Sequence, residues 1–252
     1  MKLDINGKTA LVTGSSKGIG KSIAQNLSVE GCNIMLNGRN SHSLQRAMKT
    51  MKSKTDYFVA DVTKPDECKL LVEHTIEQFG KLDILVCNVG SGRTVQQGKE
   101  TLNDWIEMFR VNLFSAINTI KAAEKYLKKS YGTIVCISSI AGIENTGGPV
   151  TYSAAKSALN TFVRNESKKL GKSKIRINAV APGNIMFPGS VWEAKKLKNP
   201  TKIRKMLSQD VALGRFGKPE EVSNLVTFLA SSKSAYITGS VFVIDGGQIQ
   251  SC

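Results

Sequence analysis

A tyrosine and a lysine four residues apart, Tyr152 and Lys156, are the pair in this sequence with the clearest chemical potential. The alanine-rich stretch around them favours a helix, and at this spacing the two side chains lie one turn apart on the same helical face. A neighbouring ammonium group favours phenolate and lowers the pKa of a phenol. The pair is therefore a candidate proton-transfer centre, although Tyr-x-x-x-Lys also occurs by chance in many helices.

A glycine-rich turn near the start of the chain is a candidate dinucleotide site. The apolar run 8–13 is typical of a strand, and residues 21–30 carry apolar side chains at helical spacing. In a strand–turn–helix context, backbone N–H groups and the helix N-terminus face a pyrophosphate. We therefore expect cofactor contacts from the turn, at Gly14, Ser16, Lys17, Gly18, Ile19 and Gly20.

The end of the second expected strand, 33–37, indicates which dinucleotide binds. An acidic residue there would accept hydrogen bonds from the ribose of NAD, whereas an arginine accommodates the 2′-phosphate of NADP. Arg39 follows this strand and Lys17 lies in the turn, so two cations could converge on one phosphate. NADP(H) is the expected cofactor; the alternative is two exposed basic residues in a lysine-rich protein.

Strand-like apolar runs alternate with helical segments along the chain. Further strands are expected at 57–60, 82–87, 133–137, 176–180 and 241–244. Near-continuous apolar strands between helices form a parallel sheet that is covered on both faces. We predict an α/β fold, a single Rossmann-type doubly wound parallel sheet with helices on both faces, in one domain spanning 1–252.

Polar and glycine residues follow several of these strands, where doubly wound sheets bind their ligands. Asp61 and the Val62 N–H, after one strand, could meet an adenine edge. Ser139 follows another strand on the same side as Tyr152, so their functional groups can converge. Other positions at or just after strand ends are Gly14, Arg39, Asn88 and Pro182-Gly183.

Composition excludes several classes of protein. The chain has 252 residues, 41% of them hydrophobic, and contains no apolar run of the ~18 residues that suggests a membrane span. The five cysteines are scattered without metal-ligand spacing, so we expect no metal and a reducing, cytoplasmic location. The net charge is +15, but the lysines are dispersed and no nucleic-acid motif is present. We expect neither a nucleic-acid nor a membrane partner.

The ordered motifs resemble those of the classical short-chain dehydrogenases/reductases over essentially the whole chain. This resemblance implies an oxidoreductase that transfers hydride between the nicotinamide of NADP(H) and a carbonyl or secondary alcohol. The matching residues are Thr13-Gly14, Gly18-Ile19-Gly20, Asp61, Asn88-Val89-Gly90, Asn112, Ser139, Tyr152, Lys156 and Pro182-Gly183.

The resemblance also implies a role for each catalytic residue. Tyr152 would be the general acid for carbonyl reduction or the base for alcohol oxidation, and Lys156 would lower its pKa and bind the nicotinamide ribose. Ser139 would donate to the substrate oxygen. Asn112 would bend its helix and hold a water in a proton relay. Further cofactor contacts are implied at Asn88, Gly90, Tyr152, Lys156, Pro182, Gly183 and Ile185.

Two positions depart from the family pattern. Val89 adds bulk where the family has the alanine of Asn-Asn-Ala-Gly. Phe187 stands where a threonine normally contacts the nicotinamide carboxamide, so backbone groups near Ile185 would hold the carboxamide instead. The second departure implies a reshaped substrate pocket.

The segment at about 186–213 has the position of the family's substrate lid and is expected to be irregular. Its Trp192 could stack on a substrate, and Ser139 and Phe187 are the other candidate substrate contacts. The segment also carries six cations, which would suit an anionic substrate, such as a phosphopantetheine thioester or a nucleotide-linked sugar, or form a solvated face. They are Lys195, Lys196, Lys198, Lys202, Arg204 and Lys205.

Within the family, the chain most resembles the bacterial 3-oxoacyl-acyl-carrier-protein reductases, so a 3-oxoacyl thioester is the first expected substrate. The alternatives are a keto-sugar or other polar metabolite, and a non-catalytic NADP-binding sensor or scaffold. The resemblance implies a homotetramer with the Tyr152 helix and the C-terminal strand at interfaces. It also implies docking of an acidic carrier protein by basic residues near the active-site entrance, for which the candidates are Lys128, Lys129, Lys172 and Lys174.

Overall fold

Seven strands form one parallel sheet in the computed structural model, which describes residues 2–92, 95 and 98–251. The order across the sheet is β3-β2-β1-β4-β5-β6-β7, and all neighbouring strands run parallel. The strand order reverses between β1 and β4, and such a switch point is where doubly wound sheets form their binding crevice. The strands are β1 (Thr9–Val12), β2 (Asn33–Gly38), β3 (Thr55–Val59), β4 (Ile84–Cys87), β5 (Thr133–Ile137), β6 (Arg176–Pro182) and β7 (Val241–Ile244).

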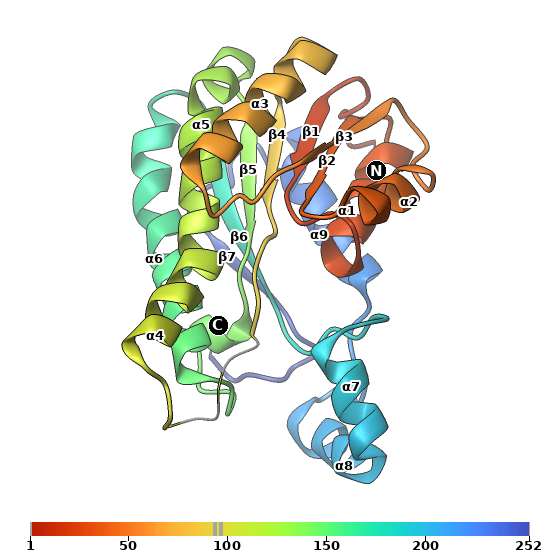
Figure 1. Ribbon diagram of the computed structural model, residues 1–252, viewed down its shortest axis with the longest axis vertical. Coiled ribbons are helices and arrows are strands. Elements are labelled where there is room, and N and C mark those ends of the chain that lie inside the picture. Colours follow the sequence, from red (N-terminus) through yellow and green to blue (C-terminus); the bar gives the residue numbers. More distant parts are fainter. Residues whose placement is uncertain (1, 93–94, 96–97, 252) are drawn as a thin grey trace.

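Helices cover both faces of the sheet, as Figure 1 shows. One layer contains α3 (Pro65–Phe79), α5 (Ser115–Ser130) and α6 (Val150–Gly171). The other contains α1 (Gly18–Val29), α2 (Ser41–Met48) and α9 (Pro219–Ala230). The predicted doubly wound, Rossmann-type sheet is confirmed.

Alternate strand side chains supply two separate cores. Leu11 and Leu85 pack with the α3–α5–α6 layer, while Val12 and Val86 pack with the α1–α2–α9 layer. All four are fully buried. This period-two alternation, with apolar side chains on both faces, explains why the strand sequences are almost continuously apolar.

The helical region predicted from Leu102 to Lys129 is present but divided. It consists of α4 (Leu102–Phe109), a π-helical turn at Arg110–Phe114, and α5. Asn112 lies in this turn, where its amide donates to the carbonyl oxygens of Met108 and Ser91, each at 3.0 Å. The helix irregularity expected at Asn112 is therefore a π-helical turn, a feature often found at functional sites.

The expectation of an irregular segment at 186–213 is wrong. This segment contains α7 (Val191–Lys198) and α8 (Pro200–Asp210), which lie beyond the carboxyl ends of the strands in Figure 1. Ser190 and Asn199 begin these helices by accepting hydrogen bonds from the N–H groups of Glu193 and Lys202. Short 3-10 turns at Ile140–Gly142 and Ser232–Ser234 complete the described elements. In the described part of the chain, no helix is long and apolar enough to cross a membrane.

Candidate active site

A cavity of about 970 Å³ runs along the carboxyl ends of the central strands. Its volume is in the range of small-molecule and cofactor sites. It brings together most of the residues singled out from the sequence: Gly14, Lys17, Ile19, Gly20, Asn88, Gly90, Ser139, Tyr152, Lys156, Pro182, Gly183, Ile185, Phe187 and Trp192. Six others do not line it: Ser16, Gly18, Arg39, Asp61, Val62 and Asn112.

Tyr152 and Ser139 converge inside this cavity. Tyr152 lies in the first turn of α6, and Ser139 lies two residues after the end of β5. The Ser139 Oγ accepts a hydrogen bond from the Ala141 N–H at 3.2 Å, which orients the hydroxyl. Burial raises the pKa of Tyr152, and a hydrogen bond with Ser139 acts in the opposite direction. The convergence predicted from the sequence is confirmed.

Lys156 is buried one helical turn below Tyr152. Its side chain is 2% exposed, and Nζ donates to the Ile137 carbonyl oxygen at 2.8 Å. Burial lowers the pKa of Lys156 to about 8. Nζ lies 5.9 Å from the centroid of the Tyr152 ring. The sequence led us to expect a lowered pKa for Tyr152, but its pKa is raised because burial outweighs the other influences.

Gly90 leaves room for the polar ends of two side chains, Asn112 and Lys156. A Cβ atom at position 90 would lie 2.8 Å from Asn112 Oδ1 and 3.0 Å from Lys156 Nζ. Asn112 Oδ1 accepts from the Ser91 N–H at 2.9 Å, which holds the end of β4 against the π-helical turn. The glycine therefore permits close packing at the candidate catalytic centre; its contact with the cofactor stays a prediction.

Asn88, which follows the neighbouring strand β4, holds the glycine-rich turn in place. The Asn88 side-chain amide donates to the carbonyl oxygens of Thr13 and Gly14 at 3.0 and 3.1 Å. A Cβ at position 20 would lie 2.4 Å from Asn88 Nδ2, so only glycine fits there. Asn88 thus shapes the turn that was expected to bind the cofactor.

Asn37 at the end of β2 is a positioning residue that the sequence analysis missed. It is buried, and Nδ2 donates to the carbonyl oxygens of Phe58 and Ala60 at 3.3 and 3.1 Å. Its Oδ1 accepts from the Gly14 N–H at 3.4 Å. The side chain therefore ties the glycine-rich turn to the end of β3. The available signal was an amide directly after the apolar run 34–36.

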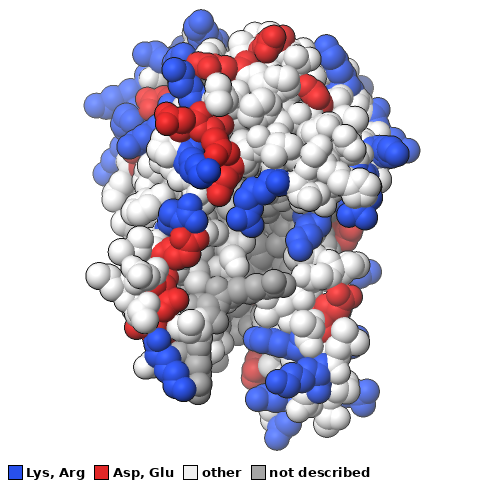
Figure 2. All heavy atoms as spheres, in the orientation of Figure 1, with Lys and Arg blue, Asp and Glu red and all other residues white. Residues whose placement is uncertain are grey.

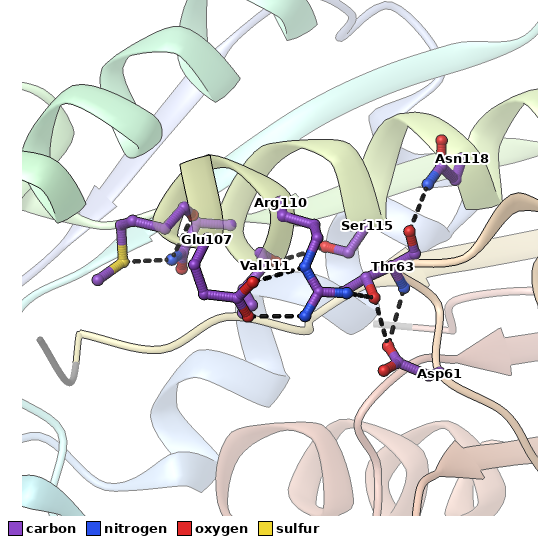
Figure 3. A network of polar contacts seen from close by, with 9 residues as sticks. Asp61, Thr63, Glu107, Arg110, Val111, Ser115 and Asn118 are labelled. Carbon is purple, nitrogen blue, oxygen red and sulfur yellow. Dashed lines mark hydrogen bonds and ion pairs between the residues drawn. The ribbon is translucent and has the colours of Figure 1, made fainter. Parts of the chain in front are cut away.

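Asp61, which was expected to meet the adenine edge, lies in a polar network with Thr63 and Arg110 (Figure 3). Asp61 Oδ1 accepts from the N–H and hydroxyl of Thr63 at 3.0 and 2.8 Å. Arg110 donates to the Thr63 hydroxyl and pairs with Glu107 at 2.6 Å. Burial acts to raise the pKa of Asp61, but the bonds from Thr63 and the charges of Arg39 and Arg110 bring it below its usual value.

Lys17 and Arg39 have different neighbours in this structure. Arg39 is exposed and close enough to Asp61 to influence its ionisation. Lys17 lines the cavity, and its Nζ is 3.8 Å from the Cβ position of Gly189 in the 186–213 segment. The two cations expected to converge on one phosphate therefore make separate contacts here.

Aromatic residues connect the 186–213 segment to the rest of the site. The Phe187 ring lies against the glycine-rich turn, with Cε2 2.5 Å from the Cβ position of Gly18. Trp192 lines the cavity with its ring centroid 5.5 Å from that of Phe216. Phe187 thus contacts the glycine-rich turn, where the cofactor is expected, and also lines the cavity.

The lysines proposed to dock a carrier protein are not at the entrance of the cavity. Lys128 and Lys129 end α5 just before β5, and Lys172 and Lys174 lie just before β6. These are the amino ends of the strands, whereas the cavity lies at their carboxyl ends. Within one chain, the expectation that these lysines lie near the entrance is wrong.

Curated relatives match the chain over nearly its whole length. The 3-oxoacyl-[acyl-carrier-protein] reductase FabG of Thermotoga maritima is 35% identical, over 97% of this chain and 99% of the relative. The diacetyl reductase [(S)-acetoin forming] of Staphylococcus epidermidis is 36% identical, over 96% of this chain and 98% of the relative.

Solved structures agree with this relationship. L-sorbose reductase from Gluconobacter frateurii, in complex with NADPH and L-sorbose, has a TM-score of 0.94 and 28% identity, with full coverage of both chains. A 7α-hydroxysteroid dehydrogenase in complex with NADH and 7-oxo glycochenodeoxycholic acid has a TM-score of 0.91 and 27% identity, over 99% of this chain and 97% of the other. The family model described as enoyl-(acyl carrier protein) reductase matches residues 14–248. The chain belongs to the short-chain dehydrogenase/reductase family of oxidoreductase enzymes.

Proposed function

We propose that this enzyme is an NADP(H)-dependent reductase of a 3-oxoacyl thioester, carried by an acyl carrier protein or a related phosphopantetheine carrier. The observation that carries the reaction type is the Tyr152–Ser139 contact beside buried Lys156, inside a cavity at the strand ends. We further propose that residues 1–252 act as one domain in a reducing, cytoplasmic setting. The segment at about 186–213 serves as its substrate lid.

The residues present fit a nicotinamide dinucleotide. The cavity extends from Gly14 in the glycine-rich turn to Tyr152, and the turn leads directly into the N-terminus of α1. Backbone N–H groups there are suited to a pyrophosphate. Arg39 would hold the 2′-phosphate, and Lys156 would hold the nicotinamide ribose. When bound, the coenzyme supplies or accepts the hydride.

Three side chains of this protein control proton transfer to and from the substrate oxygen. The raised pKa of Tyr152 keeps its phenol protonated at neutral pH, so that it can donate a proton to the carbonyl oxygen. The Ser139 hydroxyl donates a hydrogen bond to the same oxygen as negative charge develops there. The Lys156 ammonium favours the phenolate that remains. In the oxidative direction the phenolate takes the proton from the alcohol.

The substrate proposal is supported by the 35% identity with FabG and by the basic surface of the cavity. A keto-sugar is the second candidate, favoured by the similarity to the NADPH complex of L-sorbose reductase. The test is an NADPH-oxidation assay with an acetoacetyl thioester, a nucleotide-linked keto-sugar and L-sorbose. We expect the highest kcat/KM with the thioester. Faster turnover of either sugar would overturn the thioester proposal.

Arg39→Ala tests the choice of coenzyme. Because only NADPH carries a 2′-phosphate, the substitution should weaken its binding at least tenfold and change NADH binding less than twofold. Equal effects on both coenzymes would remove the reason for preferring NADP(H). Lys17→Ala, measured alongside, determines whether the second cation contributes.

A further inference from the structure

The lid turns half of its cations toward the cavity. Lys195, Lys198 and Lys202 line the cavity wall. The other three cations of α7 and α8 do not: Lys196, Arg204 and Lys205. Figure 2 shows these basic side chains gathered over the two helices, with few acidic ones among them. We call the three cations that line the cavity the inward group and the other three the outward group; each group carries three positive charges.

Helical spacing explains the inward group. Lys195 and Lys198 are three residues apart and share a face of α7. Lys202 lies in the first turn of α8, where the Asn199 side chain accepts from its N–H at 2.9 Å. Asn199 also lines the cavity. The positive end of the α8 dipole thus points to the same region as the three ammonium groups.

Acidic side chains do not neutralise the inward group. Neither the inward nor the outward cations make an ion pair with any residue that the structure describes. The Glu193 carboxylate accepts from the Gly189 N–H at 2.7 Å, and Asp210 is the acidic residue on the described cavity wall. Three lysines against one aspartate leave an excess of positive charge on the lid side of the cavity.

An apolar surface accompanies these charges. Lys195 Nζ lies 4.5 Å from the centroid of the Trp192 ring, which itself packs on Phe216. Ile203 and Met206 of α8 line the same cavity. The lid therefore combines a surface for a flexible aliphatic chain with ammonium groups for an anion.

We infer that Lys195, Lys198 and Lys202 bind a phosphate group on the tail of the substrate while its carbonyl lies at Tyr152. This inference rests on the proposed function and assigns its specificity to three side chains. A phosphate accepts several charge-assisted hydrogen bonds at once, and a cluster of lysines provides them. The phosphate belongs to a 4′-phosphopantetheine arm, either on a carrier protein or in coenzyme A.

The test compares substrates that differ by one phosphate. Acetoacetyl-pantetheine and acetoacetyl-4′-phosphopantetheine carry the same carbonyl, and acetoacetyl-coenzyme A and the acetoacetyl carrier protein distinguish the sources of the arm. The inward triple variant Lys195→Gln/Lys198→Gln/Lys202→Gln should raise KM for the phosphorylated substrates at least tenfold. It should change KM for acetoacetyl-pantetheine less than twofold. The matched outward triple variant, Lys196→Gln/Arg204→Gln/Lys205→Gln, removes the same charge and should leave both values within twofold.

A binding measurement tests the site without turnover. In a Trp105→Phe background Trp192 is the remaining tryptophan, and its fluorescence reports on the lid. With NADP⁺ saturating, 4′-phosphopantetheine should bind at least tenfold more tightly than pantetheine, and the inward variant should abolish this difference. Equal binding of the two compounds would overturn the inference, as would equal effects of the inward and outward variants. Weaker NADP⁺ binding by the inward variant would assign the lysines to the coenzyme instead.

The two proposals can fail separately. Absence of turnover with every thioester, together with phosphate-dependent binding that needs the inward lysines, would overturn the thioester reaction and retain the phosphate site. Turnover that does not respond to the phosphate would retain the reaction and overturn the site.

Discussion

Burial shifts the pKa values of Tyr152 and Lys156 in opposite directions. It raises the pKa of the phenol and lowers that of the ammonium group, so in both cases the neutral form gains. Tyr152 consequently keeps its proton, as the proposed role of proton donor requires. Lys156 is poised to change its charge near pH 8, close to the range in which enzymes work. The coenzyme and substrate would complete this centre, whose protein groups are already in place.

Tyr152→Phe should separate coenzyme binding from chemistry. The ring is kept, so NADPH binding should change less than twofold, whereas loss of the proton donor should reduce kcat by about 10²–10⁴-fold. Fluorescence titration and single-turnover kinetics measure the two quantities. Unchanged turnover would contradict the proposed mechanism and revive the alternative of a non-catalytic sensor or scaffold.

Lys156 should make the stability of the protein depend on pH. Between about pH 8 and 10.5 the folded state releases the lysine proton while the unfolded chain keeps it. The unfolded state then binds more protons, so stability rises with pH. Compared with Lys156→Met, the wild type should gain roughly 2 kcal/mol in unfolding free energy between pH 7 and pH 10.

Urea denaturation of both proteins at the two pH values measures this gain. The substitution also removes the hydrogen bond to Ile137, which lowers the unfolding free energy by an amount that does not depend on pH. The test is therefore how much the difference in unfolding free energy between the two proteins changes from pH 7 to pH 10. A difference that stays constant with pH would contradict the prediction.

Residue spacing predicted which catalytic groups meet, but not their electrostatics. Tyr152 and Lys156 are four apart on a helix, and Ser139 follows a strand, so their convergence followed from local geometry and parallel strand direction. The direction of the Tyr152 pKa shift depends on how much water the fold excludes, which neighbouring residue types do not specify. Asn37 was missed for a related reason: its partners Phe58 and Ala60 are distant in sequence and become neighbours only through strand pairing.

At the scale of elements, the site depends on one junction, where the end of β4 meets the π-helical turn and α6. Gly90 lies between Asn112 and Lys156, and Asn112 binds the backbone of Ser91 in both directions. A π-helical turn widens the helix locally, and here it coincides with the position from which Asn112 reaches the strand end. The positions of the groups next to Tyr152 therefore depend on β4, the π-helical turn and α6 together.

Gly90→Ala should disrupt this junction. The new Cβ would lie 2.8 Å from Asn112 Oδ1 and 3.0 Å from Lys156 Nζ, so these groups must move. We expect kcat to fall at least tenfold while the protein remains folded. Gly171→Ala is the control, because a Cβ there has no neighbour within 4 Å. Equal kinetics for the two variants, measured by NADPH oxidation, would show that the junction tolerates displacement.

Strands were predicted more successfully than the connections between them. Apolar runs gave the seven strands because both faces of this sheet are buried. The helices α7 and α8 were expected to be irregular, since their charged sequences show no clear apolar stripe. Their starts were nevertheless encoded by Ser190, by Asn199 and by Pro200 at the first helical position. The helix α2 was missed, although Asn40 caps it in the same way.

At the scale of the whole molecule, the two ends of the strands differ from each other, and so do the two edges of the sheet. The carboxyl ends of the strands carry the cavity and the basic helices α7 and α8, while Lys128, Lys129, Lys172 and Lys174 lie toward the amino ends. At one edge of the sheet is β3, and at the other is β7. All four residues of β7 are apolar and only half-buried, with no proline or charge to block further pairing. This edge is where we expect a second copy to pack.

Val243→Lys tests the predicted homotetramer at that edge. Because a lysine on an apolar edge strand opposes association, the variant should sediment as a smaller species than the wild type. For the wild type, analytical ultracentrifugation should give a molecular mass of about four times the 27.3 kDa chain mass. The control is Val59→Lys on β3, where Val59 is 45% exposed and no contact with a second copy is expected. A monomeric wild type, or equal sedimentation of all three proteins, would contradict this assignment of the interface.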